Sequence, residues 1–351
     1  MANDFLTRAQ KYVSAIRKSG LSIYDAVLVG DPLLWLPTPE LEAILDKGLA
    51  GLSLDGLPLR TRSKTVKEEV CRILGYPIPK SFKKTKPRFP GQMFDTYSQK
   101  ASNLQVWNEE LSGTRRYVII QVNQNDVVGR VKVVTGESLA LLDRTGTLTK
   151  KYQARCIPGT ASTELIAKSD TTRLLTAVSA QAKVHPDATP VQHPVAGEII
   201  SIAELYRNLS GLVGSRFKDA GIDQERNRGA ELHRLVSKAL GYSNHRDDGQ
   251  FPDIRHQLLE VKLQTSPTID LGVVTPASKE PLDVPMINGH QVRHCDVRYA
   301  IFYGRTDGFQ VQLTNFFLST GEAFFSRFPQ FGGKVLNSKL QMKLPDDFFD
   351  R

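Results

Sequence analysis

The sequence has few cysteines and no segment that could cross a membrane. Its three cysteines, Cys71, Cys156 and Cys295, lie far apart in a chain of 351 residues. Widely separated cysteines in odd number argue against a disulfide framework and a zinc site, and favour reduced thiols. No apolar run approaches the roughly 20 residues that span a bilayer. The first residues also lack the basic and apolar regions of a secretory signal, so we expect a cytoplasmic protein that does not enter a membrane.

Several common functional motifs are also missing. The sequence contains no Walker loop, no dinucleotide-binding fingerprint and no serine nucleophile elbow. It shows no helix-turn-helix, zinc-finger or RNA-recognition signature either. These absences argue against ATP-driven and acyl-transfer chemistry, and they give no support to a transcription factor.

What is present is an excess of positive charge on a chain of ordinary composition. The 46 lysines and arginines outnumber the 37 acidic residues, which gives a formal charge of +9 and a pI of about 9.4. A basic balance favours a polyanionic partner such as nucleic acid. The length suggests more than one domain.

We predict two domains and a connector. Two strands at 117–122 and 127–134, joined by a turn, place an α+β recognition domain at 1–155. Residues 156–196 are rich in Ala, Thr, Ser and Pro and are expected to form a linker. A capping box from Ser201 to Glu204, a helix at 226–240 and later strands indicate an α/β domain at 197–351.

The most informative stretch lies in this second domain. Residues 258–263 are typical of a short buried strand that is interrupted by charge. Alternate side chains of a strand share a face, so Glu260 and Lys262 point the same way, roughly 7 Å apart along the chain. Asp253 lies just upstream, after Pro252. Charged groups beside a core are costly unless they are paired or bind a metal.

The sequence Phe251-Pro252-Asp253-Ile254, followed by Leu259-Glu260-Val261-Lys262, resembles the PD-(D/E)xK nuclease superfamily. The likeness is to type II restriction endonucleases and to the methyl-directed mismatch-repair nicking enzyme, and it covers roughly the last 150 residues. It implies a mixed sheet flanked by helices, with Mg²⁺ as cofactor. Two carboxylates are suitable hard oxygen ligands for this ion.

The resemblance also assigns roles. Asp253 and Glu260 would hold the metal, and Lys262 would act on the attacking water. Glu231 is the helix acid best placed as an additional carboxylate, although a surface pair with Arg234 is an equal alternative. Gln264 continues the face of Glu260 and could hold a water or a phosphate oxygen. The acids at 247 and 248 compete with Asp253 for the role of first ligand.

Basic residues cluster in two places, and we expect them to contact the DNA backbone. The larger set begins near the helix expected at 65–74 and continues through a proline-containing loop at 80–91, and the smaller one begins the helix before the motif. The candidates are Arg60, Arg62, Lys64, Lys80, Lys83, Lys84, Lys86, Arg88, Arg226 and Arg228. A solvated loop is the alternative for this segment.

The sequence thus predicts a sequence-specific, Mg²⁺-dependent endonuclease of double-stranded DNA that leaves 5′-phosphate ends. Cutting both strands suggests a homodimer, with a DNA methyltransferase of the same system as a further partner. Two alternatives remain open: a modification-dependent or mismatch-repair-type nicking enzyme, and a non-enzymatic DNA-binding protein.

Overall fold

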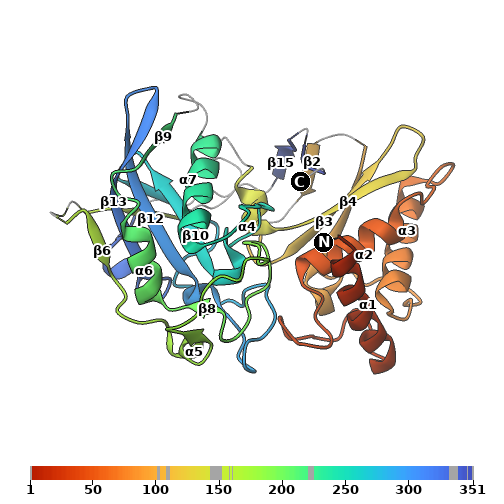
Figure 1. Ribbon diagram of the computed structural model, residues 1–351. Helices are drawn as coiled ribbons and strands as arrows, with labels where there is room; N and C mark the ends of the chain where they lie inside the picture. Colours follow the sequence, from red (N-terminus) through yellow and green to blue (C-terminus); the bar gives the residue numbers. More distant parts are fainter. Residues whose placement is uncertain are drawn as a thin grey trace. The chain divides into compact units, whose positions relative to one another are not determined.

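The computed structural model describes residues 2–100, 103–107, 111–142, 152–157, 159, 161–219, 225–331, 339–345 and 347–349. The chain divides into two compact units (Figure 1). Unit 1 comprises Met1–Lys150, Asp283–Pro285 and Val335–Arg351, and unit 2 comprises Lys151–Leu282 and Met286–Lys334. Each unit has its own hydrophobic core. The predicted α/β class is confirmed.

These bounds differ from the predicted domains at three places, the shortest being Asp283–Pro285, which belongs to unit 1. The expected linker contributes strand β6 (Thr163–Leu165), which pairs in parallel with β13 (Gln310–Thr320) and so belongs to unit 2. The end of the chain returns to unit 1, because β15 (Lys339–Lys343) pairs with β2 (Asn103–Trp107). Both pairings join segments far apart in sequence, which local composition does not reveal.

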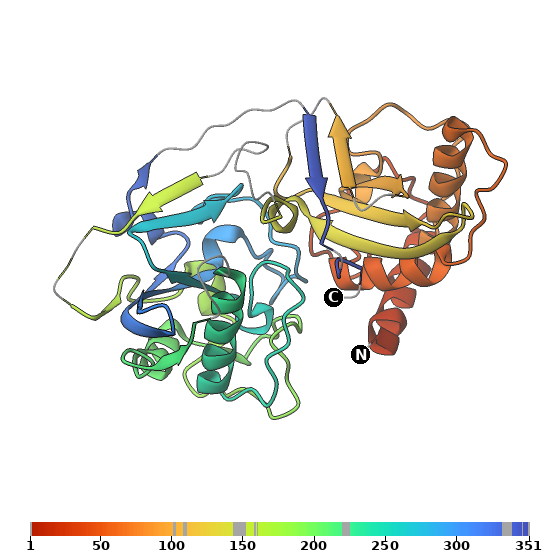
Figure 2. The same cartoon turned by 90° about the horizontal axis from the view of Figure 1, so that it is seen from above.

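Unit 1 packs three helices against a three-stranded sheet. The helices are α1 (Ala2–Ser19), α2 (Thr38–Leu49) and α3 (Leu59–Leu74). The sheet has the order β1 (Phe94–Gln99), β3 (Arg116–Val122), β4 (Val128–Thr135), with β1 parallel to β3 and β3 antiparallel to β4. A short 3-10 turn, η1 (Pro90–Gln92), precedes β1, and helix α4 (Gly136–Ala140) follows β4. Figure 2 shows the three helices in red and orange beside the yellow strands β3 and β4.

Unit 2 is built around a mixed five-stranded sheet. Its main path is β10 (Leu259–Gln264), β12 (Arg298–Thr306), β13 and β6, and β9 (Arg216–Lys218) also pairs with β13. Helices α6 (Ile202–Ser210) and α7 (Glu225–Leu240) lie against this sheet (Figure 1). The 3-10 turn η2 (Arg255–Gln257) precedes β10.

The remaining elements of unit 2 are short. They are β5 (Tyr152–Arg155), α5 (Thr172–Leu175), β7 (Val178–Ser179), β8 (Ile199–Ile200), β11 (Thr268–Gly272), η3 (His294–Asp296), η4 (Phe324–Ser326) and β14 (Gln330–Phe331). Strand β5 lies between β11 and β14 in a second small sheet. Among the described residues, no helix is both long and apolar enough to span a membrane.

Local sequence signals succeeded to different degrees. The Ser201 side chain accepts a hydrogen bond from the Glu204 N–H, which confirms the predicted helix start. The hairpin predicted at 117–134 forms as β3–β4, and the strands predicted late in the second domain include the hairpin β12–β13. The sequence Thr65-Val66-Lys67-Glu68 is that of a capping box and predicts a helix start there, which is wrong, because α3 begins six residues earlier at Leu59, after Pro58. Proline supplies the helical entry there without a side-chain cap.

Candidate active site

The motif strand has the predicted two faces. Leu259, Val261 and Leu263 join the core between sheet and helices. On the other face, Nζ of Lys262 lies 3.1 Å from Oε1 of Glu260, and their side chains are only 18 % and 10 % exposed. Because β10 runs parallel to β12, the strand is not part of a surface hairpin. The pair is therefore sheltered from solvent, unlike the solvated pair that a surface hairpin would carry.

Asp253 is held against the start of this strand by two backbone hydrogen bonds. Its own N–H donates to Oε2 of Glu260 at 3.2 Å. Its Oδ2 accepts from the N–H of Val261 at 3.0 Å. The turn η2 brings these groups together, because it ends at Leu258 in the left-handed conformation (φ 47°) and reverses the chain into β10. The three residues of the predicted motif are thus gathered at one point.

The electrostatics of this point favour a bound cation. Burial raises the pKa of Asp253 well above its usual range, and the negative charges of Glu260 and Asp247 raise it further. The Val261 N–H and Lys262 act in the opposite direction. Like charges crowded in a buried place need a positive partner if both carboxylates are to be ionised. Lys262 supplies one such charge on the Glu260 side.

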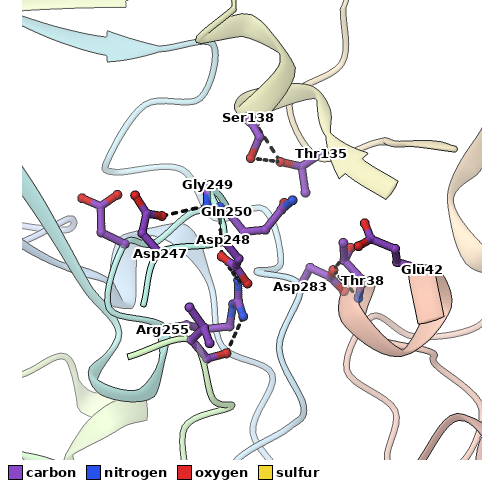
Figure 3. Close-up of polar contacts among 12 residues, drawn as sticks. Thr38, Glu42, Thr135, Ser138, Asp247, Asp248, Gly249, Gln250, Arg255 and Asp283 are labelled. Carbon is purple, nitrogen blue, oxygen red and sulfur yellow. Dashed lines mark hydrogen bonds and ion pairs between the residues drawn. The ribbon is translucent and has the colours of Figure 1, made fainter. Parts of the chain in front are cut away.

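The two other acids of the preceding loop have different surroundings (Figure 3). Asp248 accepts from Nη2 of Arg255 with both oxygens, at 3.0 and 2.9 Å, and Arg255 is itself buried. Asp247 is exposed and accepts from the N–H of Gly249 at 2.7 Å. Asp248 is therefore held in an ion pair with Arg255. Asp247 influences Asp253 through its negative charge, which raises the pKa of the Asp253 carboxyl.

Two residues of helix α7 bear on the motif, the predicted Glu231 and a histidine that the sequence did not single out. Glu231 is 43 % exposed and pairs with Arg234, Nε to Oε2 at 3.1 Å, which is the alternative that the sequence left open. His233 is buried, and burial lowers its pKa, whereas the charges of Asp247 and Glu260 raise it. Sequence analysis missed His233 because a lone histidine between Leu232 and Val236 on an apolar face is typical of a core residue.

Asp253 and Glu260 are the candidate metal ligands of this site. Among the residues that the structure describes, no cluster of three or more His, Cys, Asp or Glu side chains has the arrangement of a metal site. Mg²⁺ is commonly bound by one or two carboxylates, with waters and substrate phosphates completing its shell. Asp253 and Glu260, close together and short of positive charge, fit that ion. Gln264 lies half-buried at the end of β10, on the same face as these ligands by alternation.

The predicted DNA-contacting residues of unit 1 fall into two groups. Lys80, Lys83, Lys84 and Lys86 are exposed, and Arg88 is half-buried. Arg62 is engaged within the unit, because it donates to the Leu57 carbonyl and pairs with Asp126. Lys64 is exposed and lies 3.7 Å from Glu68. The side chain of Arg60 lies outside the described residues.

Arg228, at the start of α7, is not the surface residue that the sequence predicted. Arg228 is 8 % exposed and makes two hydrogen bonds to Asp219, at 2.6 and 3.0 Å. This correction has a simple cause: Asp219, at the end of β9, is buried and needs a cation. The side chain of Arg226 lies outside the described residues.

Comparisons of the chain with protein-family models, with curated proteins and with solved structures find no match.

Proposed function

We propose that the chain is a Mg²⁺-dependent endonuclease that hydrolyses phosphodiester bonds of double-stranded DNA, with a restriction-endonuclease-like core in unit 2. The observation that carries this proposal is the gathering of Asp253, Glu260 and Lys262 at the start of β10. The set has two hard oxygen ligands and one cation, which is what hydrolysis of a phosphodiester requires.

When bound, Mg²⁺ would supply a polarised water and positive charge beside the phosphoryl oxygens. Asp253 and Glu260 would hold the ion, and the hydrogen bonds from the Asp253 and Val261 N–H groups position the two carboxylates next to each other. Lys262 lies next to Glu260, where its ammonium orients the attacking water and stabilises negative charge on the phosphate. Gln264 is placed to hold a water or phosphate oxygen on the same face.

Attack of water on phosphorus and departure of the 3′ oxygen leave a 5′-phosphate and a 3′-hydroxyl. A duplex has two antiparallel strands, so cutting both at once needs two active sites. Two copies of the chain related by a two-fold axis supply them. A homodimer on DNA is therefore part of the proposal.

The test is incubation of the purified chain with unmethylated and with host-methylated DNA, each with Mg²⁺ or with EDTA. We expect discrete Mg²⁺-dependent fragments from at least one DNA, whereas Asp253→Asn should cut neither. Asp270→Asn, which neutralises an exposed acid on β11, is the matched control and should cut as the wild type does. Intact DNA with wild-type protein and Mg²⁺ would reject the nuclease, and nicked circles without linear products would favour the nicking alternative.

A further inference from the structure

Unit 1 repeats the local backbone of the candidate active site. Both 3-10 turns are followed by a non-glycine residue in the left-handed conformation, Met93 with φ 50° and Leu258 with φ 47°. In both, the residue before the turn exchanges backbone hydrogen bonds with the first residue of the next strand, as Phe89 does with Phe94. Each turn leads into a six-residue strand that runs parallel to the central strand of its unit.

Two buried arginines occupy matching places. Arg116 pairs with the first residue of β1, and Arg298 with the first residue of β10. Arg116 donates to the carbonyl of Leu36. Arg298 donates to the carbonyl of Ile200 at 2.9 Å. Each of these carbonyls lies two residues before a helix, α2 or α6. A fully buried arginine is rare, so the same arrangement twice is informative.

A buried glutamine closes the same loop in each unit. Gln92 and Gln257 are the last residues of the two 3-10 turns. Their side-chain oxygens accept from the N–H of Leu36 at 3.1 Å and from that of Ile200 at 2.8 Å. The side-chain amide of Gln92 donates to the Leu34 carbonyl at 2.7 Å, and that of Gln257 donates to the Glu198 carbonyl at 3.0 Å. Each of these carbonyls lies two residues before the residue whose N–H the glutamine accepts.

Identical short sequences mark the ends of matching elements. Helices α3 and α7 both have 16 residues and both end at Leu-Gly-Tyr, with the glycine in the left-handed region. Thr-Gly-Glu begins at the last residue of β4 and at the last residue of β13, at 135–137 and 320–322. A Cβ on Gly136 would lie 1.9 Å from a backbone oxygen, and one on Gly321 would lie 2.3 Å from another. Only glycine fits in either place.

These correspondences align the motif residues of unit 2 with residues of unit 1. Arg88 occupies the place of Asp253, and Asp95 that of Glu260. The cradle is retained, because the N–H of Arg88 donates to Oδ1 of Asp95 at 2.8 Å, as that of Asp253 does to Glu260. Tyr97 stands where unit 2 has its lysine, and its ring stacks on another tyrosine of the core. Unit 1 therefore lacks both the first carboxylate and the ammonium group.

The charge of the two sites is opposite. Arg115 lies 3.3 Å from Asp95, and Lys67 takes the place on α3 that His233 has on α7. Burial lowers the pKa of Lys67, and the positive charge of Arg88 lowers it further, so these two cations act on one another. Unit 1 thus has Arg115 beside the Asp95 carboxylate and Lys67 within electrostatic reach of Arg88, where unit 2 has Lys262 beside Glu260 and near Asp253. By position, an arginine replaces the first carboxylate of the unit 2 motif.

We propose that Lys67, Arg88 and Arg115 bind a phosphodiester of the DNA backbone without a metal ion and without cleaving it. Each chain would then have two DNA-binding sites of one fold, of which only that of unit 2 is catalytic. This inference rests on the proposed function for its choice of DNA. The exposed lysines at 80, 83, 84 and 86 directly precede Arg88 and extend the positive surface beyond one phosphate. That extent favours a nucleic acid backbone over a small anion.

The experiment measures binding of the full chain to a labelled duplex in EDTA by fluorescence anisotropy. Without a divalent ion, the two carboxylates of unit 2 repel phosphate, so unit 1 should dominate binding. The double variant Lys67→Gln/Arg88→Gln removes two cations and leaves the backbone N–H of residue 88 as donor. We expect at least a tenfold weaker affinity and a salt slope lower by about 1, since the neutralisation of one phosphate is lost.

Lys11→Gln/Lys18→Gln is the matched control, because it removes two exposed cations from α1 in the same unit. It should bind nearly as the wild type does. A double variant at positions 67 and 88 that keeps both wild-type affinity and wild-type thermal unfolding would overturn the proposal. If the double variant unfolds at a lower temperature than the wild type, the single variant Lys67→Gln is measured instead. We expect its affinity for DNA to be about threefold weaker, and an unchanged affinity would overturn the proposal.

Failure of the nuclease proposal would look different. Asp253→Asn should lose Mg²⁺-dependent cleavage and retain binding in EDTA. A wild-type chain that binds in EDTA through Lys67 and Arg88 but never cuts would reject the nuclease and keep this site.

Discussion

Lys262 and Glu260 form an ion pair along one strand face, with Nζ 3.1 Å from Oε1. Both side chains are largely buried, so the pair gains more from attraction than a surface pair would. The lysine lies beside a candidate metal ligand, which places its charge at the point where a phosphate would be attacked. This relationship gives the first of four predictions.

Lys262→Met should lower DNA cleavage by about 10²- to 10³-fold, because it removes a fixed positive charge from the transition state. DNA binding in Ca²⁺ should persist, since the two carboxylates remain. Single-turnover cleavage of a supercoiled plasmid measures the cleavage rate, and fluorescence anisotropy measures DNA binding. Lys279→Met, at an exposed position of unit 2, is the control for loss of one charge. Full activity of Lys262→Met would remove the residue from the mechanism.

The second prediction concerns stability rather than catalysis. Arg228→Met should destabilise the fold by about 3–5 kcal/mol, because Asp219 is left as a buried charge without its cation. Asp219 also accepts from the Thr306 hydroxyl, which cannot replace that charge. Urea unfolding measures the free energy of unfolding of the variant and of the wild type. The control Arg216→Met, at an exposed position of β9, should change that free energy little. Normal stability with weakened DNA binding would instead restore Arg228 to the DNA surface.

Much of the motif could be predicted because its signals are local. Proline before Asp253 and the alternation of Leu259, Glu260 and Val261 determine the strand and its faces within a few residues. Arg228 could not be placed, because its partner lies on another element and the sequence does not show that both are buried. A charged residue at a helix start is usually solvated, and that expectation was wrong here.

The repeat within the chain was also invisible at the sequence level. Arg116 and Arg298 begin strands, where an arginine is normally exposed, and their partners are backbone carbonyls that any residue could supply. Identity is confined to single residues and to segments as short as Leu-Gly-Tyr, which do not stand out in a sequence of this length. The candidate catalytic positions themselves differ in charge between the units. The two units are aligned by the backbone geometry and by the hydrogen bonds of the buried arginines and glutamines.

The third prediction tests the lysine-rich loop of unit 1. Replacing Lys83, Lys84 and Lys86 together by Gln should weaken DNA binding and lower the salt slope by about 3, at close to one unit for each phosphate contact. All three side chains are exposed, so the fold should be unaffected. Binding measured between low and moderate salt gives the slope. An unchanged slope would mean that the loop is a solvated surface.

The fourth prediction follows from a buried histidine. His294 stacks on Phe251 with ring centres 5.2 Å apart, and burial lowers its pKa to about 4, from 6.5. The unfolded chain therefore binds a proton at this residue at a higher pH than the folded chain does. Stability should be complete above pH 6.5 and should fall as the pH decreases toward 4, where this residue contributes a loss of roughly 3 kcal/mol.

His294→Phe retains an aromatic ring for the stack on Phe251 and cannot take up a proton. Its free energy of unfolding should therefore fall less steeply between pH 6.5 and pH 4 than that of the wild type, by the share that His294 contributes. His185→Phe, at an exposed position, is the control and should leave the pH dependence unchanged. Chemical unfolding at several pH values gives both curves. Parallel curves for wild type and His294→Phe would show that this ring is protonated as readily in the folded chain as in the unfolded one, and that its burial does not contribute to acid sensitivity.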